Sequence, residues 1–463
     1  MNNLTHVIAA VSTPPGKGGV AIIRMSGSGA FEIADKVFFT ISGKKFSDCE
    51  PRKQIYGHII EDGEKIDDVL ATRFPAPHSY TGEDTVEIGC HGGILVTRTV
   101  LEALLRAGAV PATAGEFTRR AFINGRLTLT EAEAISDLLE AKSREQIRLS
   151  SDGARAVLSG KISAIRKSLV ELMSSIYARI DYPDEDLGDF SDDQVLSRLY
   201  NIKEDCEKLL STYRTGRAIS EGVNTVICGK PNAGKSSLYN LLLGEDAAIV
   251  TDIPGTTRDV LRHSLPLGRV MLNIADTAGI REREDMDAVE RIGIAKSRDL
   301  ISKSELLFAI FDTSRPFDEE DQLILDTVKC SGGAKIALLN KTDLDNKFDE
   351  SMLCGFDAVI RISALMGEAD AIFTLTRTVE NLFTDEKIIV GTDPIISSAR
   401  QHGVLVRSLD FVNAAVENLQ LGFSQDAVST DVERALGAIS ELDGRAVSEE
   451  IVSDIFSKFC VGK

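Results

Sequence analysis

Residues 229–236 read Gly-Lys-Pro-Asn-Ala-Gly-Lys-Ser, and no other segment restricts the possible folds of this chain as strongly. The segment follows an apolar run at 224–228 and precedes a run with helical spacing that starts at Ser237. A strand, a glycine-rich turn and a helix in this order surround phosphate groups with backbone N–H donors, and the helix dipole adds positive potential. In such a loop Lys235 would contact the outer phosphates and the Ser236 hydroxyl would bind Mg²⁺. Taken alone, the pattern is also compatible with a glycine-rich turn carrying a surface lysine.

Three further motifs, at 276–279, 340–343 and Ser363-Ala364, follow in the order expected of a guanine-nucleotide site, and the last fits a loop whose backbone reads guanine O6. Residues 276–279 read Asp-Thr-Ala-Gly after an apolar run, which predicts Asp276 near the metal and Gly279 beside the outermost phosphate. Residues 340–343 read Asn-Lys-Thr-Asp, and a buried Asp343 carboxylate that guanine pairs and adenine leaves unpaired would disfavour ATP by kilocalories. The predicted nucleotide-binding residues are Gly229, Asn232, Ala233, Gly234, Lys235, Ser236, Ser237, Thr251, Thr256, Thr257, Asp276, Gly279, Asn340, Lys341, Asp343, Ser363 and Ala364.

Hydrolysis of the nucleotide needs groups beyond those that bind it. Residues 251–259 read Thr-Asp-Ile-Pro-Gly-Thr-Thr-Arg-Asp and fit a switch segment in which Thr257 is the expected Mg²⁺ ligand. Many small GTPases place a water-orienting glutamine directly after the Asp-x-x-Gly glycine, but this chain has Ile280 there. Isoleucine can neither orient water nor carry charge, so another residue or a cation must meet the developing charge. The segment that follows, REREDMDAVERIG, offers several acidic residues for this role, but these could also form the solvated face of a helix.

Composition narrows the class of protein and its compartment. Acidic residues outnumber basic ones by 71 to 52, so any contact with nucleic acid is expected to be local or shared with a partner, because phosphate neutralisation dominates that affinity. Seven dispersed cysteines without a Cys-x-x-Cys pair are typical of reduced thiols. No apolar run approaches membrane-spanning length and the N-terminus lacks signal-peptide features. We therefore expect a cytoplasmic protein with no membrane contact.

The pattern along the chain predicts a multidomain protein with an insertion. A glycine- and β-branched-rich α/β domain at 1–120 precedes a helical domain whose first part is 121–216. Strands and helices alternate across 217–384, as in a doubly wound domain, and a second helical part covers 385–463. We expect the two helical parts to pack together. Within the first part, Thr130 followed by Glu133 predicts a capping box that opens a long amphipathic helix.

With these motifs in view, the chain resembles the MnmE (TrmE) family of tRNA-modification GTPases over essentially its whole length. The resemblance rests on TPPGKGGVAIIRMSG, SYTGEDTVEIGCHGG, GEFTRRAFINGRLTLTEAEAI, GKPNAGKSSLYN, IVTDIPGTTRD, DTAGIRE with VERIG, and the terminal FCVGK. The family ends in Cys-Ile-Gly-Lys, and this chain has Val461 in the isoleucine position. The resemblance implies a folate-binding-like N-terminal α/β domain, an all-α domain and an inserted α/β P-loop GTPase domain.

The resemblance also implies how GTP would be hydrolysed. Family members are potassium-dependent GTPases whose G domains approach each other, and a monovalent cation would answer the charge problem left by Ile280. Glu290 matches the water-orienting glutamate and, with Lys235, is a predicted catalytic residue. The implied K⁺ ligands are Asn232, Thr251, Ile253 and Thr256.

A tetrahydrofolate site is a further implication of the resemblance. The donor would be a 5-formyl- or methylene-tetrahydrofolate held by the N-terminal domain, and the family often has lysine where this chain has Arg126. Cys460 is a candidate participant in one-carbon transfer, with a small buried thiol as the alternative. The matching folate-binding residues are Arg24, Glu87, Arg126 and Lys463, each of which could otherwise be a surface charge or an ordinary salt bridge.

The implied activity is modification of the tRNA wobble uridine at carbon five with a carboxymethylaminomethyl or aminomethyl group. The chain would act as a homodimer that forms a heterotetramer with an FAD protein resembling MnmG, and would share tRNA with that partner. GTP hydrolysis would drive a conformational cycle rather than chemistry on the base. The alternative is a regulatory or ribosome-assembly GTPase without modification chemistry, and folate binding would separate the two.

Overall fold

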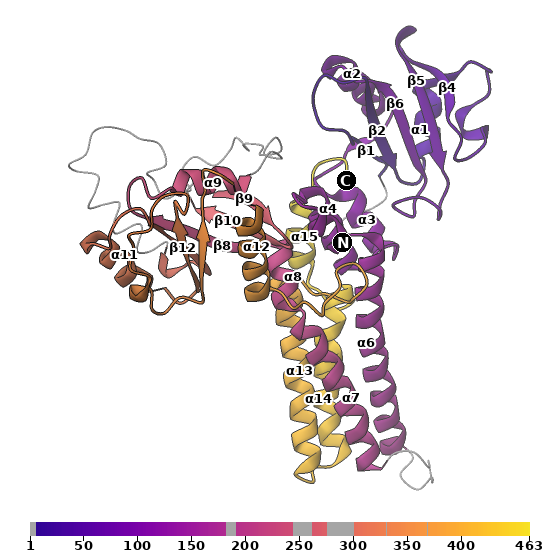
Figure 1. Ribbon diagram of the computed structural model, residues 1–463. Coiled ribbons are helices and arrows are strands. Elements are labelled where there is room, and N and C mark those ends of the chain that lie inside the picture. The colour runs from indigo at the N-terminus through magenta and orange to yellow at the C-terminus, as the bar shows by residue number, and fades with distance from the viewer. Residues whose placement is uncertain (1–5, 182–190, 244–261, 276–300, 330, 368) are drawn as a thin grey trace. The chain divides into compact units, whose positions relative to one another are not determined.

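The structure is a computed structural model that describes residues 6–181, 191–243, 262–275, 301–329, 331–367 and 369–463 (Figure 1). The chain forms two compact units, of which the first comprises residues 1–136 together with 436–463 and the second comprises 137–435. The first unit therefore contains both terminal parts of the chain. No helix within the described ranges is both long and apolar enough to cross a membrane.

The first unit is built on a seven-stranded sheet in the order β3-β4-β5-β6-β2-β1-β7. Its strands are β1 (Ile8–Val11), β2 (Val20–Ser26), β3 (Phe38–Thr40), β4 (Ile55–Glu61), β5 (Glu64–Phe74), β6 (Thr85–His91) and β7 (Val110–Pro111). Only β1 and β7 pair in parallel. Along β2, Ile23 and Met25 are fully buried, whereas Arg24 points to the opposite face because side chains alternate along a strand.

Two helices of the first unit cover one face of this sheet, and a third packs against the β1 end of the other face. The helices of this unit are α1 (Ala30–Val37), the 3₁₀ turn η1 (Phe46–Asp48), α2 (Ile94–Arg106), α3 (Glu116–Ile123), α4 (Leu129–Glu140, whose last residues belong to the second unit) and α15 (Glu449–Ser457). Residues of α1 and α2 share one apolar core with the sheet, and Ile33, Val100 and Leu104 are among them. On the opposite face, Phe117 of α3 packs against Ile8 and Ala10, and a groove runs along β2, β5 and β6.

The start of α4 corrects one expectation. The capping box lies at Thr128 and Glu131, because the Thr128 N–H donates to Glu131 Oε2 (2.7 Å) and the Glu131 N–H donates to Thr128 Oγ1 (3.2 Å). The prediction at Thr130 and Glu133 is wrong by two residues. Thr130 is buried and its hydroxyl donates to the carbonyl oxygen of Leu442 (2.7 Å). The side chain predicted to cap the helix therefore makes a tertiary contact.

The second unit contains long helices that run side by side (Figure 1). Its helices outside the sheet domain are α5 (Arg144–Leu149), α6 (Asp152–Asp181), α7 (Asp192–Ser211), α8 (Tyr213–Ser220), α13 (Ala399–Gln420) and the first part of α14 (Gln425–Asp443). Buried residues recur every three or four positions along α6, as in Leu158, Ile162, Ile165 and Leu169. The α7 helix contacts both α6 and α13, so the helical parts before and after the insertion pack together as predicted.

In its described residues, the inserted domain contains a six-stranded sheet in the order β13-β12-β11-β8-β10-β9. Its elements are β8 (Val223–Gly229), α9 (Lys235–Leu243), β9 (Arg262–Leu267), β10 (Val270–Ala275), β11 (Leu306–Asp312), α11 (Glu319–Lys329), β12 (Ala334–Asn340), the 3₁₀ turn η3 (Glu350–Met352), β13 (Ala358–Ile362) and α12 (Ala369–Phe383). All neighbouring strands pair in parallel except β9 and β10. The predicted fold, an α/β N-terminal domain, a helical domain and an inserted α/β P-loop domain, is confirmed.

Candidate functional site

The phosphate-binding loop lies at the carboxyl end of the central strand β8, where parallel sheets place their ligands. The loop needs left-handed backbone at two positions, since Asn232 has φ 60° and Gly234 has φ 106°. A side chain on Gly234 would overlap Asn340 Nδ2, so only glycine fits. Between them, Ala233 is buried, and α9 begins at Lys235 with Ser236 and Ser237 in its first turn. The helix N-terminus thus faces the loop.

Lys235 lies against the carbonyl oxygens of its own loop. Its Nζ donates to the carbonyl oxygens of Gly229 (2.8 Å) and Lys230 (2.7 Å). Burial lowers the pKa of Lys235, because the ammonium is partly removed from water and carbonyls compensate only in part. A bound phosphate would supply the anion that this ammonium lacks.

Asn340, the last residue of β12, ties two loops of the site together. Its Nδ2 donates to the Ala233 carbonyl oxygen (2.7 Å) and its Oδ1 accepts from the Ala364 N–H (2.9 Å). The Ser363 hydroxyl donates to Asp343 Oδ1 (2.6 Å), which leaves the second carboxylate oxygen of Asp343 for a base. The structure therefore brings the predicted residues of the phosphate loop and the base-reading loops to one edge of the sheet.

The surroundings of Asp343 differ from the expectation. The residue is exposed rather than buried, because the loop after β12 leaves the sheet at this point. Discrimination against adenine would thus depend on the base itself covering the carboxylate. Several predicted residues lie outside the described part of the chain: Thr251, Ile253, Thr256, Thr257, Asp276, Gly279 and Glu290.

A second candidate site lies on the open face of the first unit's sheet. Arg24 and Glu87 are register partners on β2 and β6, and the Arg24 Nε and Nη2 both donate to Glu87 Oε1 (2.9 and 2.7 Å). The Arg24 guanidinium carbon lies 5.4 Å from the centroid of the Tyr80 ring and 5.7 Å from that of Phe117. Both distances fit cation–π contacts, which hold the guanidinium in place.

A groove of about 520 Å³ runs along this face and reaches Glu87. Gly19 and Gly89 line it without side chains, Val20 and Leu70 give it apolar surface, and Tyr56 adds an aromatic ring. A mostly apolar groove with a few polar groups is the usual form of a small-molecule site. The His91 ring, which lies at the groove, has its Nδ1 2.6 Å from Asp67 Oδ1.

The end of the chain lies beside the same α3 helix that carries Phe117. Val461 forms a β-bridge with Ala114, and the Phe117 N–H donates to the Lys463 carbonyl oxygen (3.1 Å). The Ser12 hydroxyl donates to the Gly462 carbonyl oxygen (3.0 Å). These contacts hold the segment that contains Cys460. Cys460 is a free and exposed thiol, so the alternative of a small buried thiol is wrong.

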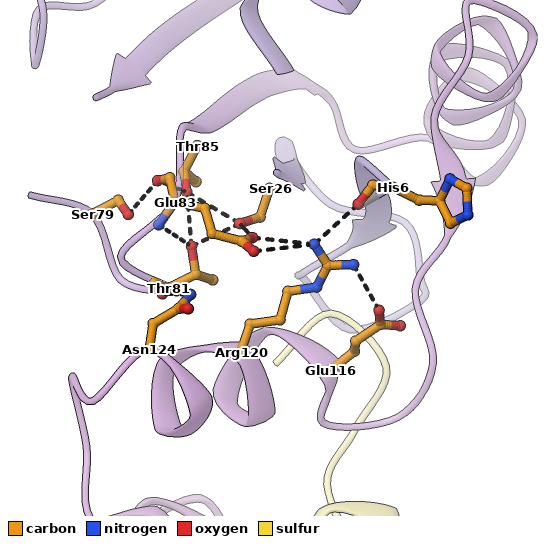
Figure 2. A network of polar contacts seen from close by, with 9 residues as sticks. All are labelled: His6, Ser26, Ser79, Thr81, Glu83, Thr85, Glu116, Arg120 and Asn124. Atoms are coloured by element: carbon orange, nitrogen blue, oxygen red, sulfur yellow. Dashed lines mark hydrogen bonds and ion pairs between the residues drawn. The ribbon is translucent and has the colours of Figure 1, made fainter. Parts of the chain in front are cut away.

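Arg126, the last of the predicted folate-binding residues, lies against the loop formed by residues 79–85. Side chains of this loop belong to the polar network in Figure 2. The stem of Arg126 packs on Gly82, whose substitution by a residue with Cβ would place that atom 3.2 Å from Arg126 Cγ. Arg120 is 2 % exposed, and its Nη1 donates to the His6 carbonyl oxygen (3.0 Å) and to Glu83 Oε2 (3.1 Å). Glu83 Oε2 also accepts from the Ser26 hydroxyl (2.8 Å). The network fixes the loop from which Tyr80 contacts Arg24.

Sequence reasoning did not assign Tyr80, Phe117 and Arg120 to this site. All three lie in segments that carry the family resemblance, SYTGED and GEFTRRAF, so a signal for them was present. The pattern alone could not indicate that an arginine in an amphipathic helix would be fully buried, because burial of Arg120 depends on carboxylates from Glu83 and Glu116 that converge only in the fold.

Residues 7–126 match the family described as "GTP-binding protein TrmE N-terminus", and residues 129–460 match the "MnmE helical domain" family. Proteins named "tRNA modification GTPase MnmE" are similar to the chain over its whole length. That of Thermotoga petrophila is 41% identical over 462 residues, and that of Thermotoga maritima is 40% identical over 462 residues. The protein of Finegoldia magna is 40% identical over 457 residues, and each alignment covers 98% of this chain and 99% of the relative.

Proposed function

Because the chain belongs to the MnmE (TrmE) family of tRNA modification GTPases, we propose that its GTPase activity serves the modification of the wobble uridine in certain tRNAs. With an FAD protein resembling MnmG, it installs a carboxymethylaminomethyl or aminomethyl group at carbon five of that base. The one-carbon unit comes from a tetrahydrofolate derivative, and glycine or ammonium supplies the nitrogen.

The folate part of the proposal is supported by the ion pair on the open sheet face. A folate carries a flat, polar pterin ring and acidic glutamate carboxylates. The Arg24 guanidinium, fixed by Glu87 and by the rings of Tyr80 and Phe117, is a pre-organised cation beside an apolar groove. Further positive charge comes from Arg126, just after α3, and from Lys463, whose carbonyl oxygen contacts α3. Cys460 lies in the same terminal segment as Lys463.

The nucleotide part is supported by the residues that surround the phosphate loop. Ser236 carries an exposed hydroxyl in the first turn of α9, which fits a Mg²⁺ ligand, and Asn232 carries an exposed amide on the loop, which fits a K⁺ ligand. Such cations supply positive charge where it is needed as a phosphoryl group leaves. Lys235 binds the outer phosphates in exchange for the carbonyl contacts that it makes now, and Asp343 holds the base.

The proposed partners, a second copy of the chain, a flavoprotein and tRNA, are supported by the net charge and by the exposed sheet face of the first unit. A net charge of −19 suits a protein that shares tRNA with a more basic partner. Val20 is 66% exposed and Leu70 is 43% exposed on the face of the sheet opposite α1 and α2, which supports a homodimer through the first unit. The dimer with two partner subunits gives the heterotetramer.

The observation that carries the proposal is the Arg24–Glu87 pair at the groove, and folate binding tests it. Equilibrium dialysis of the full-length chain with 5-formyl-tetrahydrofolate should give saturable binding. Arg24→Met should weaken binding at least about tenfold, the loss expected when a desolvated charge contact is removed. The matched control is Arg98→Gln, which removes an exposed arginine paired with Glu102 in the same unit and should leave binding unchanged. No detectable binding by the unaltered chain would contradict the folate proposal and favour an assembly GTPase.

A further inference from the structure

Residues 312–321, which run from the end of β11 into the first turn of α11, contain three aspartates that contact lysines of the nucleotide site. Asp312 ends β11 between the strands β8 and β12, which lead to the phosphate loop and to the base-reading loop. Its Oδ1 accepts hydrogen bonds from the Ser314 N–H (3.0 Å) and hydroxyl (2.6 Å). The carboxylate is thus oriented by its own turn.

The other oxygen of Asp312 holds Lys341. Asp312 Oδ2 lies 2.6 Å from Lys341 Nζ, and the Asp312 side chain is 11% exposed. Burial raises the pKa of Asp312, but hydrogen bonds from Lys341 and Ser314 outweigh it, so the pKa is lowered and the carboxylate is charged at neutral pH. Arg315 also faces this carboxylate, but it lies 3.7 Å away and is 70% exposed. Lys341 is therefore the main partner.

The phosphate loop is held from the other end of the segment. Asp318 and Asp321 form a reciprocal cap at the start of α11, because each backbone N–H donates to the other's carboxylate at 3.2 Å. Lys230, the second residue of the phosphate loop, places its Nζ 2.5 Å from Asp318 Oδ1 and 2.6 Å from Asp321 Oδ2. The Asp321 side chain is only 4% exposed, so its charge is matched by Lys230 rather than by water.

We propose that residues 312–321 act as an acidic clamp on the nucleotide site, with Asp312 as the positioning residue for Lys341 and Asp321 as that for the phosphate loop. Lys341 lies between Asn340, which bonds the phosphate loop, and Asp343, which accepts from the Ser363 hydroxyl. With its ammonium fixed by Asp312, Lys341 is held in one orientation beside the carboxylate that would read the base. The inference rests on the guanine-nucleotide binding proposed above and names residues that prepare the same site.

Two opposing effects decide the sign of the prediction. The negative charge of Asp312 would repel the phosphates of a nucleotide, so neutralising it could tighten binding. That charge is already paired with Lys341 at 2.6 Å, so the ammonium offsets most of the repulsion. In Asp312→Asn, Lys341 loses the partner that fixes it beside the base-reading residues. We therefore expect weaker nucleotide binding as the net effect.

The test is a double-mutant cycle on the full-length chain with GDP and GTP as probes. Asp312→Asn should raise the Kd of both nucleotides about tenfold, and should raise KM for GTP while kcat is retained, because the contact acts equally in the ground and transition states. Lys341→Met should raise the Kd similarly, and Asp312→Asn should add less than about twofold to it. Asp326→Asn is the matched control, since it removes the same charge from an exposed α11 residue paired with Lys329, and it should change nothing.

Three results would overturn the clamp: unchanged binding by Asp312→Asn, tighter binding, or full additivity with Lys341→Met. Because a buried pair can also support folding, Lys230→Met and Asp321→Asn are compared by thermal melting and by Kd. Both should weaken nucleotide binding in the folded protein without adding to each other, and additive losses would contradict the phosphate-loop half of the clamp. An unaltered chain that fails to bind GDP would contradict the proposed function instead.

Discussion

At the scale of single residues, side chains that connect loops matter as much as those that would touch a ligand. Asn340 bonds Ala233 and Ala364, which belong to loops far apart in the sequence. Ser363 donates to one oxygen of Asp343 and thereby orients the other. A bound guanine would meet a carboxylate whose direction is already set, which lowers the entropic cost of binding.

Asp343→Asn tests the base pocket. The amide cannot accept both hydrogen bonds that guanine offers, so GTP affinity should fall about 100-fold, while xanthosine triphosphate should bind better than GTP. Competition between GTP and xanthosine triphosphate for a fluorescent nucleotide measures both. Ser363→Ala is the companion variant and should weaken GTP binding less, because it only frees the carboxylate to rotate. Unchanged GTP affinity in Asp343→Asn would mean that the base is read elsewhere.

At the scale of elements, the sequence predicted types of structure better than their ends. The order strand, loop, helix around residues 229–236 is found as β8, loop and α9, since short apolar runs and glycines act locally. The start of α4 was misplaced because the Thr130 hydroxyl bonds Leu442, a residue distant in the sequence. Likewise, no local pattern could indicate that Lys341 meets Asp312, because β11 and β12 become neighbours only when the sheet forms.

Gly216→Ala tests how closely α8 must approach the chain that leaves the inserted domain. A Cβ at Gly216 would overlap the carbonyl oxygen of Ile396, which is backbone and cannot move cheaply. The variant should lower the free energy of unfolding by about 1–3 kcal/mol, as overpacking does. Gly160→Ala is the matched control, because it lies in α6 with nothing near its Cβ and should stabilise by about 0.5–1 kcal/mol. Calorimetric melting that ranks the two variants the other way would contradict this packing.

At the scale of the whole molecule, the C-terminal segment packs in the same unit as the N-terminal part of the chain. The first unit combines residues 1–136 with 436–463, and Val461 pairs with Ala114 beside the helix that carries Phe117. The sequence pattern predicted that the two helical parts pack together, and the contact of α7 with α13 confirms this. The pattern gave no sign of the bridge to Ala114, because a two-residue pairing leaves no pattern in a sequence.

The proposed potassium dependence is tested at this scale, since it would depend on two copies of the chain meeting. GTP hydrolysis should be faster in potassium than in sodium and should rise with protein concentration. Asn232→Ala should abolish the difference while GDP still binds. Because Asn232 has φ 60°, alanine adds backbone strain, and Asn232→Gly is the control that removes the amide without that strain. Equal rates in the two salts for the unaltered chain would contradict the potassium proposal.

The most direct measurement of the central claim is mass spectrometry of wobble nucleosides after reaction. Purified chain and its flavoprotein partner would be incubated with unmodified tRNA, GTP, potassium, methylene-tetrahydrofolate and either glycine or ammonium. We predict carboxymethylaminomethyluridine with glycine and aminomethyluridine with ammonium, both lost in Arg24→Met. A wobble uridine left unmodified under conditions in which the chain hydrolyses GTP and binds folate would contradict the central claim.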